Sequence, residues 1–248
     1  RGITLVEIFP RQKIKEILRG KVLKCYQIRN NNQDDNWVNN KKIFKNTLDP
    51  FSAVLDAKIM HLSIDEWIKN VELARQKQKS LQNEIGNIHQ EILGSLDGWS
   101  DLGIGGVIDL ENKEKKIIAE IKNKWNTTKG NHMTEIYDDI NHLLSKKYLS
   151  YIGYYVEILP KNGKKYNKNF TPSDNKKKER RPENKKIRVI DGESFYELAT
   201  GNKNALRILF NEFPILIDEI LKEEFEGYKS SALGGKEEIL FNTIFHKK

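Results

Sequence analysis

The stretch IGGVIDLENKEKKIIAEIKNKW, residues 104–125, decides the fold expected for this chain. It holds two short apolar runs, 104–110 and 116–123, which have the length and the β-branched content of strands. The polar residues 111–114 between them have the composition of a tight connection. The stretch therefore predicts a β-hairpin.

Three charged side chains converge on this hairpin. Residues two apart on a strand share a face, so Glu120 and Lys122 point the same way, and Asp109 near the end of the first strand sits opposite them. Two carboxylates and an ammonium group are costly to bury in a sheet, and a purely structural hairpin would seldom place them there. This cost indicates that the hairpin holds a functional site.

The spacing of these residues matches the PD-(D/E)xK nuclease motif, with Asp109, ten residues, and then Glu120 and Lys122. Carboxylates from adjacent strands can hold Mg²⁺ and leave coordination positions for water and a phosphate. Asp109 and Glu120 are the expected metal ligands, with the backbone carbonyl of Ile121 as a third. Lys122 would orient the attacking water and stabilise the charged phosphate. The motif's usual proline is replaced by Ile108.

Composition bounds the class of protein. The chain has 248 residues, enough for one main domain, and its 43 Lys and Arg against 35 Asp and Glu give a net charge of +8, which favours a polyanionic partner. A single cysteine, Cys25, excludes an internal disulfide framework and a cysteine-built zinc site, and fits a reducing cytoplasm. No apolar run of membrane-spanning length and no signal-peptide organisation is present, so neither membrane insertion nor secretion is expected.

The remaining pattern predicts an α/β fold in which a mixed β-sheet is flanked by helices, and the resemblance of Asp109, Glu120 and Lys122 to the PD-(D/E)xK motif implies a restriction-endonuclease-like core. Ser63 and Glu66 form a capping-box pattern that starts a long amphipathic helix ending near Gly94. The other elements expected are a helix over 132–147, a central strand over 149–159, a strand over 187–190, a helix over 194–200, and a helix from 204 that Pro214 interrupts and that resumes through 224.

Between the last two predicted strands lies a strongly basic insertion, residues 161–188, with twelve Lys or Arg against three Asp or Glu. It is either a solvated, mobile loop or a loop that orders on DNA phosphates, with Lys177, Arg180 and Arg181 as candidate contacts. We expect an endonuclease catalytic domain over 51–226, followed by a C-terminal tail, 227–248. The N-terminal segment 1–50 has no informative pattern.

The polar face of the long helix is a second candidate DNA surface. It carries Lys79, Asn83 and Gln90, for which an ordinary solvated face is the alternative. Glu84 lies at the border of the apolar stripe, where its carboxylate could reach a site on the packed sheet.

Three segments resemble a family of type II restriction endonucleases that recognise GGNCC or closely related sites. They are RQKQKSLQNEIGNIHQEILGS (75–95), EIKNKWNTTKG (120–130) and GESFYELATG (192–201), and the resemblance covers roughly residues 51–221. It implies Mg²⁺-dependent hydrolysis of both strands of double-stranded DNA at a short palindrome by a homodimer whose two-fold axis matches that of the site.

The resemblance also implies roles for individual residues. Glu84 becomes an outer carboxylate of the metal site, whereas Asn123 and Asn126 would support the ligands or contact DNA. Lys124 and Thr127 join the candidate DNA contacts, and His89 is left outside the catalytic set.

Two alternatives stay open on the sequence alone. One is a structure-directed nuclease with the same core, such as a junction resolvase or a repair endonuclease. The other is a DNA-binding module whose acidic hairpin is only structural.

Overall fold

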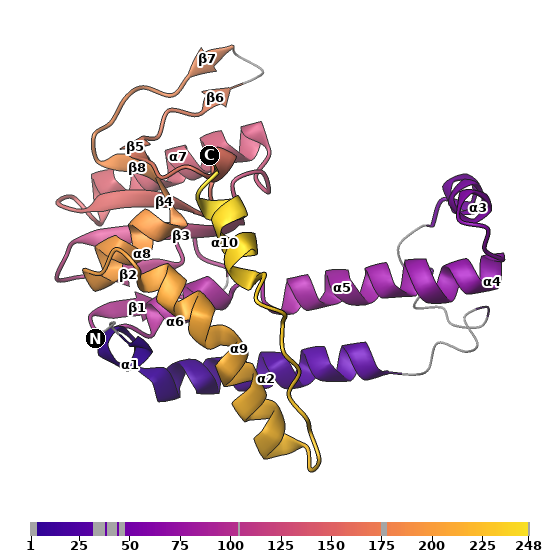
Figure 1. Cartoon of the computed structure of the whole chain (residues 1–248). Coiled ribbons are helices and arrows are strands. Elements are labelled where there is room, and N and C mark those ends of the chain that lie inside the picture. Colours follow the sequence, from indigo (N-terminus) through magenta and orange to yellow (C-terminus); the bar gives the residue numbers. More distant parts are fainter. Residues whose placement is uncertain are drawn as a thin grey trace. The chain divides into compact units, whose positions relative to one another are not determined.

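The structure is a computed structural model that describes residues 4–31, 38, 44, 48–103, 105–174 and 178–247. It divides the chain into two compact units, whose elements are labelled in Figure 1. The first unit contains Arg1–Arg19 and Asn87–Lys248, and the second contains Gly20–Gly86. The sequence places residues 1–50 in a segment of their own and 51–86 in the catalytic domain, so these units divide the chain elsewhere.

The first unit is built on a mixed six-stranded sheet with the order β1-β2-β3-β4-β8-β5. Strands β3, β4 and β8 are parallel, and the other neighbouring pairs are antiparallel. The strands are β1 (Trp99–Asp101), β2 (Leu110–Asn112), β3 (Ile117–Lys124), β4 (Ile152–Leu159), β5 (Asn167–Asn169) and β8 (Ile187–Asp191), with β6 (Ser173–Asp174) and β7 (Glu179–Arg180) as a separate pair. The helices are α1 (Leu5–Ile8), α6 (Ile88–Gly94), α7 (Gly130–Lys146), η4 (Lys161–Gly163), α8 (Gly192–Thr200), α9 (Ala205–Glu224) and α10 (Glu237–Phe245). The predicted α/β core with a mixed sheet flanked by helices is confirmed.

Helix α7 covers one face of the sheet. Parallel strands need a long crossover connection, and α7 supplies it between β3 and β4. Its apolar stripe, with Ile136 and Ile140, packs with Ile118 and Tyr155 of the strands. The approach is close at Gly153, where an added Cβ would lie 2.3 Å from Cγ2 of Ile140.

Helix α8 covers the opposite face. Tyr154, which alternates with Tyr155 along β4, packs its ring edge-on against Phe195 of α8, with the ring centroids 5.9 Å apart. The helix begins at Asp191, whose side chain accepts a hydrogen bond from the backbone N–H of Ser194. It ends at Gly201, in the left-handed region with φ of 75°, as predicted from the glycine.

The hairpin exists, but its first strand was predicted too early. Strand β2 covers Leu110–Asn112, and residues 105–109 form no strand because Gly105 has φ of 98° and Gly106 follows it. Ile104 lies outside the described residues. The turn falls at 113–116, where Asn112 Oδ1 accepts the backbone N–H of Lys115 at 2.8 Å.

The long helix predicted over 63–94 is not continuous. It starts with the predicted capping box at Ser63, but it ends at Glu84 because Ile85 has a non-helical backbone and Gly86 follows. The second unit contains most of this predicted helix, as α4 (Ile64–Trp67), the π-helix η3 (Ile68–Glu72) and α5 (Leu73–Glu84). It also contains α3 (Pro50–Ile59), which precedes the capping box. Helix α2 (Arg11–Asn30) begins in the first unit, where Arg11 pairs with Glu219 of α9 at 2.6 Å, and ends in the second.

Three further predictions about the second half of the chain need correction. Helix α9 runs without interruption through Pro214, although a proline inside a helix removes one backbone hydrogen bond. The basic insertion is not all loop, because it contributes β5 to the edge of the main sheet and the β6–β7 pair. The tail after 226 contains helix α10, anchored through the buried Phe241 and Phe245.

Candidate active site

The hairpin brings Asp109 and Glu120 together. Leu110 pairs with Ala119, so one step further along this register Asp109 stands opposite Glu120. The backbone N–H of Asp109 donates to the Ala119 carbonyl at 2.9 Å. The carboxylate is fixed by a hydrogen bond of 2.7 Å from the backbone N–H of Ile121 to Oδ2. Asp109 therefore lies directly before its strand, with its side chain held against β3.

The surroundings of Glu120 disfavour its ionised form. Burial, and then the negative charge of Asp109, raise its pKa to about 7 despite the neighbouring ammonium of Lys122. Burial also raises the pKa of Asp109, against the opposing effect of the Ile121 hydrogen bond. One oxygen of Glu120, Oε1, accepts from Lys122 Nζ at 2.6 Å. The other, Oε2, is buried and has no hydrogen-bond partner in the described part of the chain.

These groups fit a hard divalent cation. A buried carboxylate oxygen without a donor is costly, and an oxygen-ligated cation between two acidic side chains would remove that cost. Within the described residues, no three His, Cys, Asp or Glu side chains are grouped to hold a metal, and the hairpin brings two carboxylates together.

Sequence reasoning missed one buried acid beside this site. Glu157 on β4 pairs in register with Lys122 on β3, so both side chains lie on the same face of the sheet. It is only 6% exposed, accepts the Tyr166 hydroxyl at 2.5 Å, and has a pKa raised chiefly by burial. The signal was present in the sequence, since Glu157 is the one charged residue in the apolar run YIGYYVEIL.

Of the four candidates on the predicted long helix, three belong to the second unit. Lys79 and Asn83 are exposed there, and Glu84 is paired with Lys24 at 2.6 Å. Gln90 belongs to the first unit, where its side chain donates to Asp101 Oδ1 at 2.8 Å. The role of Glu84 as an outer carboxylate stays a prediction.

The polar residues after Lys122 line the exit of β3. Asn123 and Lys124 end the strand and are half-buried, whereas Asn126 and Thr127 are exposed in the following turn. Thr127 closes that turn by donating from Oγ1 to the carbonyl of Lys124 at 2.8 Å.

The three basic candidates in the insertion differ from one another. Lys177 lies outside the described residues. Arg180 is exposed on β7, and Arg181 is bound by two hydrogen bonds of 2.8 and 2.7 Å to Asp138 of α7. Arg181 thus fastens the insertion to α7.

His89 has a structural environment. Its Nδ1 lies 2.8 Å from the hydroxyl of the buried Tyr196, and burial lowers its pKa to about 4. A neutral histidine bonded to a core tyrosine agrees with its exclusion from the catalytic set.

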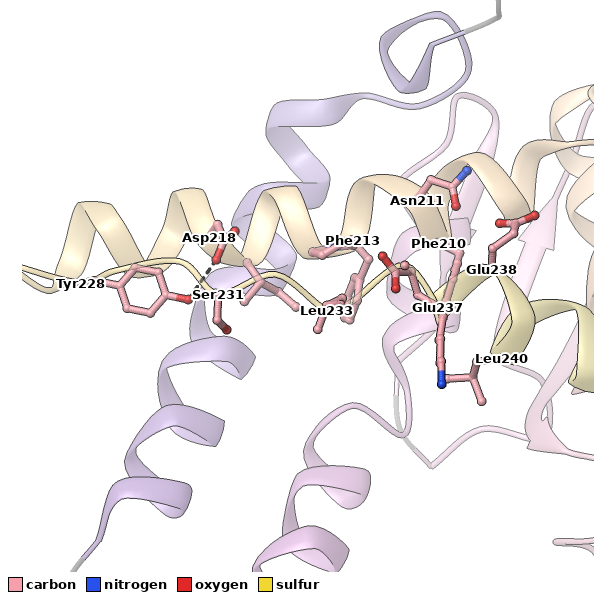
Figure 2. A pocket seen from close by; sticks show the side chains of 14 residues that line it. Phe210, Asn211, Phe213, Asp218, Tyr228, Ser231, Leu233, Glu237, Glu238 and Leu240 are labelled. Carbon is pink, nitrogen blue, oxygen red and sulfur yellow. Dashed lines mark hydrogen bonds between the residues drawn. The ribbon is translucent and has the colours of Figure 1, made fainter.

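A pocket of about 860 Å³ lies away from this chemistry, along α9, the segment after it and the start of α10 (Figure 2). Much of its lining is apolar, including Phe210, Phe213 and Leu233. Tyr228 donates to Asp218 at 2.9 Å at one end of it. Neither of the hairpin carboxylates lines this pocket, so the pocket is separate from the hairpin site.

The fold and the site together define a class. A mixed sheet whose hairpin presents two neighbouring carboxylates and a lysine, in a chain of net charge +8, is the arrangement of a PD-(D/E)xK nuclease. Among the described residues, no helix is long and apolar enough to cross a membrane.

Comparison with known proteins gives the family. Residues 14–222 match the Eco47II restriction endonuclease family. The chain is 45% identical over 186 residues to the type II restriction enzyme Eco47II of Escherichia coli, covering 74% of this chain and 77% of that enzyme. It is 30% identical over 196 residues to the type II restriction enzyme Sau96I of Staphylococcus aureus, covering 78% and 74%.

The chain therefore belongs to the Eco47II restriction endonuclease family and is a type II restriction enzyme, a site-specific deoxyribonuclease. The family relation selects the restriction endonuclease from the three classes that the sequence left open, in preference to a structure-directed nuclease or a non-catalytic DNA-binding module. Double-stranded DNA is its partner.

Proposed function

We propose that this enzyme hydrolyses both strands of DNA at a short palindromic GGNCC-like site, with Mg²⁺ held by Asp109 and Glu120. The observation that carries the proposal is the buried Oε2 of Glu120, which has no hydrogen-bond donor among the described residues and lies beside a second carboxylate. The GGNCC-like site and the homodimer follow from the resemblance of residues 75–95, 120–130 and 192–201, and the family relation supports them.

Each hairpin residue has a distinct role in this proposal. The two acidic ligands are Glu120 and Asp109, whose carboxylate is fixed by the Ile121 N–H. The third proposed ligand is the backbone carbonyl oxygen of Ile121. Bound Mg²⁺ supplies a Lewis acid that acidifies water and offsets charge on the phosphate. Lys122, only partly exposed, orients the attacking water and donates to the phosphate as the P–O bond to the 3′ or 5′ oxygen breaks.

Glu157 and Tyr166 have a positioning role beside Lys122 in this proposal. Lys122 is paired with Glu120 in the structure, and a cation bound by Glu120 would offset that negative charge. Glu157 is in register with Lys122 on the neighbouring strand β4 and on the same face of the sheet, and we assign it as the second acidic group that orients the lysine. Tyr166 orients the Glu157 carboxylate by its hydrogen bond.

DNA contacts are assigned to the exposed groups around the hairpin. Asn123, Lys124, Asn126 and Thr127 leave the site on the strand that carries Lys122, and Arg180 is exposed on the insertion. Arg181 would have to leave Asp138 before it could contact a phosphate.

Digestion of unmodified phage DNA tests the activity. With Mg²⁺ the protein should give discrete fragments, and with EDTA it should give none. Nicking confined to branched DNA would contradict site-specific cleavage, and a mobility shift without any cleavage would contradict catalysis.

A further inference from the structure

Helix α3 of the second unit exposes its large apolar side chains. Its small residues Ala53 and Ala57 are buried against Trp67, Ile68 and Leu73, which form the core of this unit. Its large apolar residues face outward instead. A helix in a monomeric protein normally turns its large apolar side chains inward.

The outward residues form one continuous stripe, which we call the α3 stripe. Phe51, Leu55 and Ile59 are 86%, 63% and 68% exposed, and they recur at intervals of four along the helix, on one side of it. Val54 and Met60 extend the stripe and are about half exposed. In a chain with 31% charged residues, such a stripe is unusual.

The helix is held rigidly, so its exposure is not the result of a loose end. Asp49 caps its first turn by accepting the backbone N–H of Phe51 at 3.0 Å. Asp56 accepts the indole N–H of Trp67 at 2.8 Å, which fixes the helix to the core of the unit. A rigid apolar surface loses little conformational entropy when it is covered.

We propose that the α3 stripe is covered by the α3 stripe of a second copy of this chain, so that the second unit forms the homodimer contact. A two-fold contact requires a surface that matches itself, and an apolar stripe on a straight helix does so. Antiparallel pairing would also bring Lys58, in the last turn, toward the first turn of the second copy, where the N-cap is Asp49.

The area of the stripe agrees with this occupant. Five large side chains, most of them more than half exposed, offer roughly 500 Å² per copy, and two copies approach the lower end of a specific interface of about 1,200–2,000 Å². A DNA surface would need clustered positive charge, and Lys58 is the one basic residue of α3. The choice of a second copy rests on the proposed homodimer.

Sedimentation equilibrium of the full chain without DNA and in EDTA tests this inference. We expect the wild type to be a dimer at micromolar concentration and the Leu55→Glu, Ile59→Glu double variant to be a monomer with unchanged circular dichroism. The matched control is Ile239→Glu, which changes an equally exposed apolar residue on α10 and should remain a dimer. A dimeric double variant, or a wild type that is monomeric over the whole range, would overturn the inference.

A cross-link keeps the test independent of folding. In a Cys25→Ser background, Leu55→Cys should form a disulfide-linked dimer on oxidation, and Ile239→Cys should not. Equal cross-linking of both variants would overturn the assignment to α3. Asp109→Asn protein should sediment as the wild type does, so an error in the proposed metal site would appear in cleavage and leave this measurement unchanged.

Discussion

At the scale of single residues, the proposed metal site contains a carboxylate that is poorly stabilised without a cation. Glu120 has a pKa of about 7 because burial and Asp109 oppose its ionisation, and its Oε2 has no donor among the described residues. The free enzyme is therefore expected to lose stability at the position where it is proposed to bind metal. Substitution and titration of this group and its neighbours should expose that cost.

Glu120→Gln should stabilise the metal-free protein at pH 8. A carboxyl group whose folded pKa is raised costs stability above its unfolded pKa near 4.5, and this cost is complete once the pH exceeds about 7. Removing the charge should add on the order of 2 kcal/mol to the free energy of unfolding at pH 8 in EDTA. The gain should vanish near pH 4.5, and a melting temperature that falls at pH 8 would contradict it.

Metal binding should release a proton at low pH. Below about pH 7 the carboxylate pair holds a proton that Mg²⁺ must displace, so the apparent dissociation constant should rise about fivefold from pH 7 to pH 6. Calorimetric titration in two buffers of different ionisation enthalpy measures the protons released. The expected number is near one at pH 6 and near zero at pH 8, and equal numbers at both would be inconsistent with the raised pKa.

Glu157→Gln should slow turnover without weakening DNA binding. The variant keeps the size of the side chain but removes the negative charge across from Lys122. We expect kcat to fall about tenfold with KM for DNA unchanged, because the loss affects a group that acts in the transition state. Glu183→Gln, on an exposed residue of the insertion, is the control. A change in KM alone would assign Glu157 to DNA binding.

At the scale of elements, the sequence predicted the parts whose patterns are set locally. The capping box at Ser63, the crossover helix α7, the central strand β4 and the helix closed by Gly201 all appear because caps, periodicity and glycine act within a few residues. The juxtaposition of Asp109 and Glu120 was also predicted, because their spacing is local to one hairpin.

The errors arose where neighbouring elements decide the outcome. Gly105 and Gly106 shortened the first hairpin strand, and a non-helical Ile85 divided a periodic stretch between two units. Pro214 did not stop α9, because packing of buried residues on both sides of it, such as Leu209 and Leu216, outweighs one lost hydrogen bond. Glu157, which is in register with Lys122, was missed because strand register is not visible in the sequence.

One element contact is testable by a small substitution. Gly153→Ala should destabilise the first unit by about 1–3 kcal/mol, because the new methyl group would overlap Ile140 of α7 and bend the crossover away from β4. Gly20→Ala, where nothing lies within 4 Å of the added Cβ in helix α2, should be neutral or stabilising by up to about 1 kcal/mol. Urea unfolding followed by circular dichroism compares the two, and equal midpoints would contradict the close packing.

At the scale of the whole molecule, the two units have separate proposed roles. The first unit carries the hairpin that is proposed to cut DNA, and the second carries the α3 stripe that is proposed to join two copies. The basic excess of the chain supplies attraction to DNA, which depends on salt, while specificity requires contacts to base edges.

The most direct test of the hairpin as the catalytic site is the cleavage rate of Asp109→Asn on a plasmid that the wild type cuts with Mg²⁺. The substitution preserves size and removes the charge of a proposed ligand, and DNA binding is measured in parallel by mobility shift with Ca²⁺. We predict a rate at least about 100-fold lower with DNA affinity retained. Cleavage by Asp109→Asn at the wild-type rate would show that the hairpin is not the catalytic site.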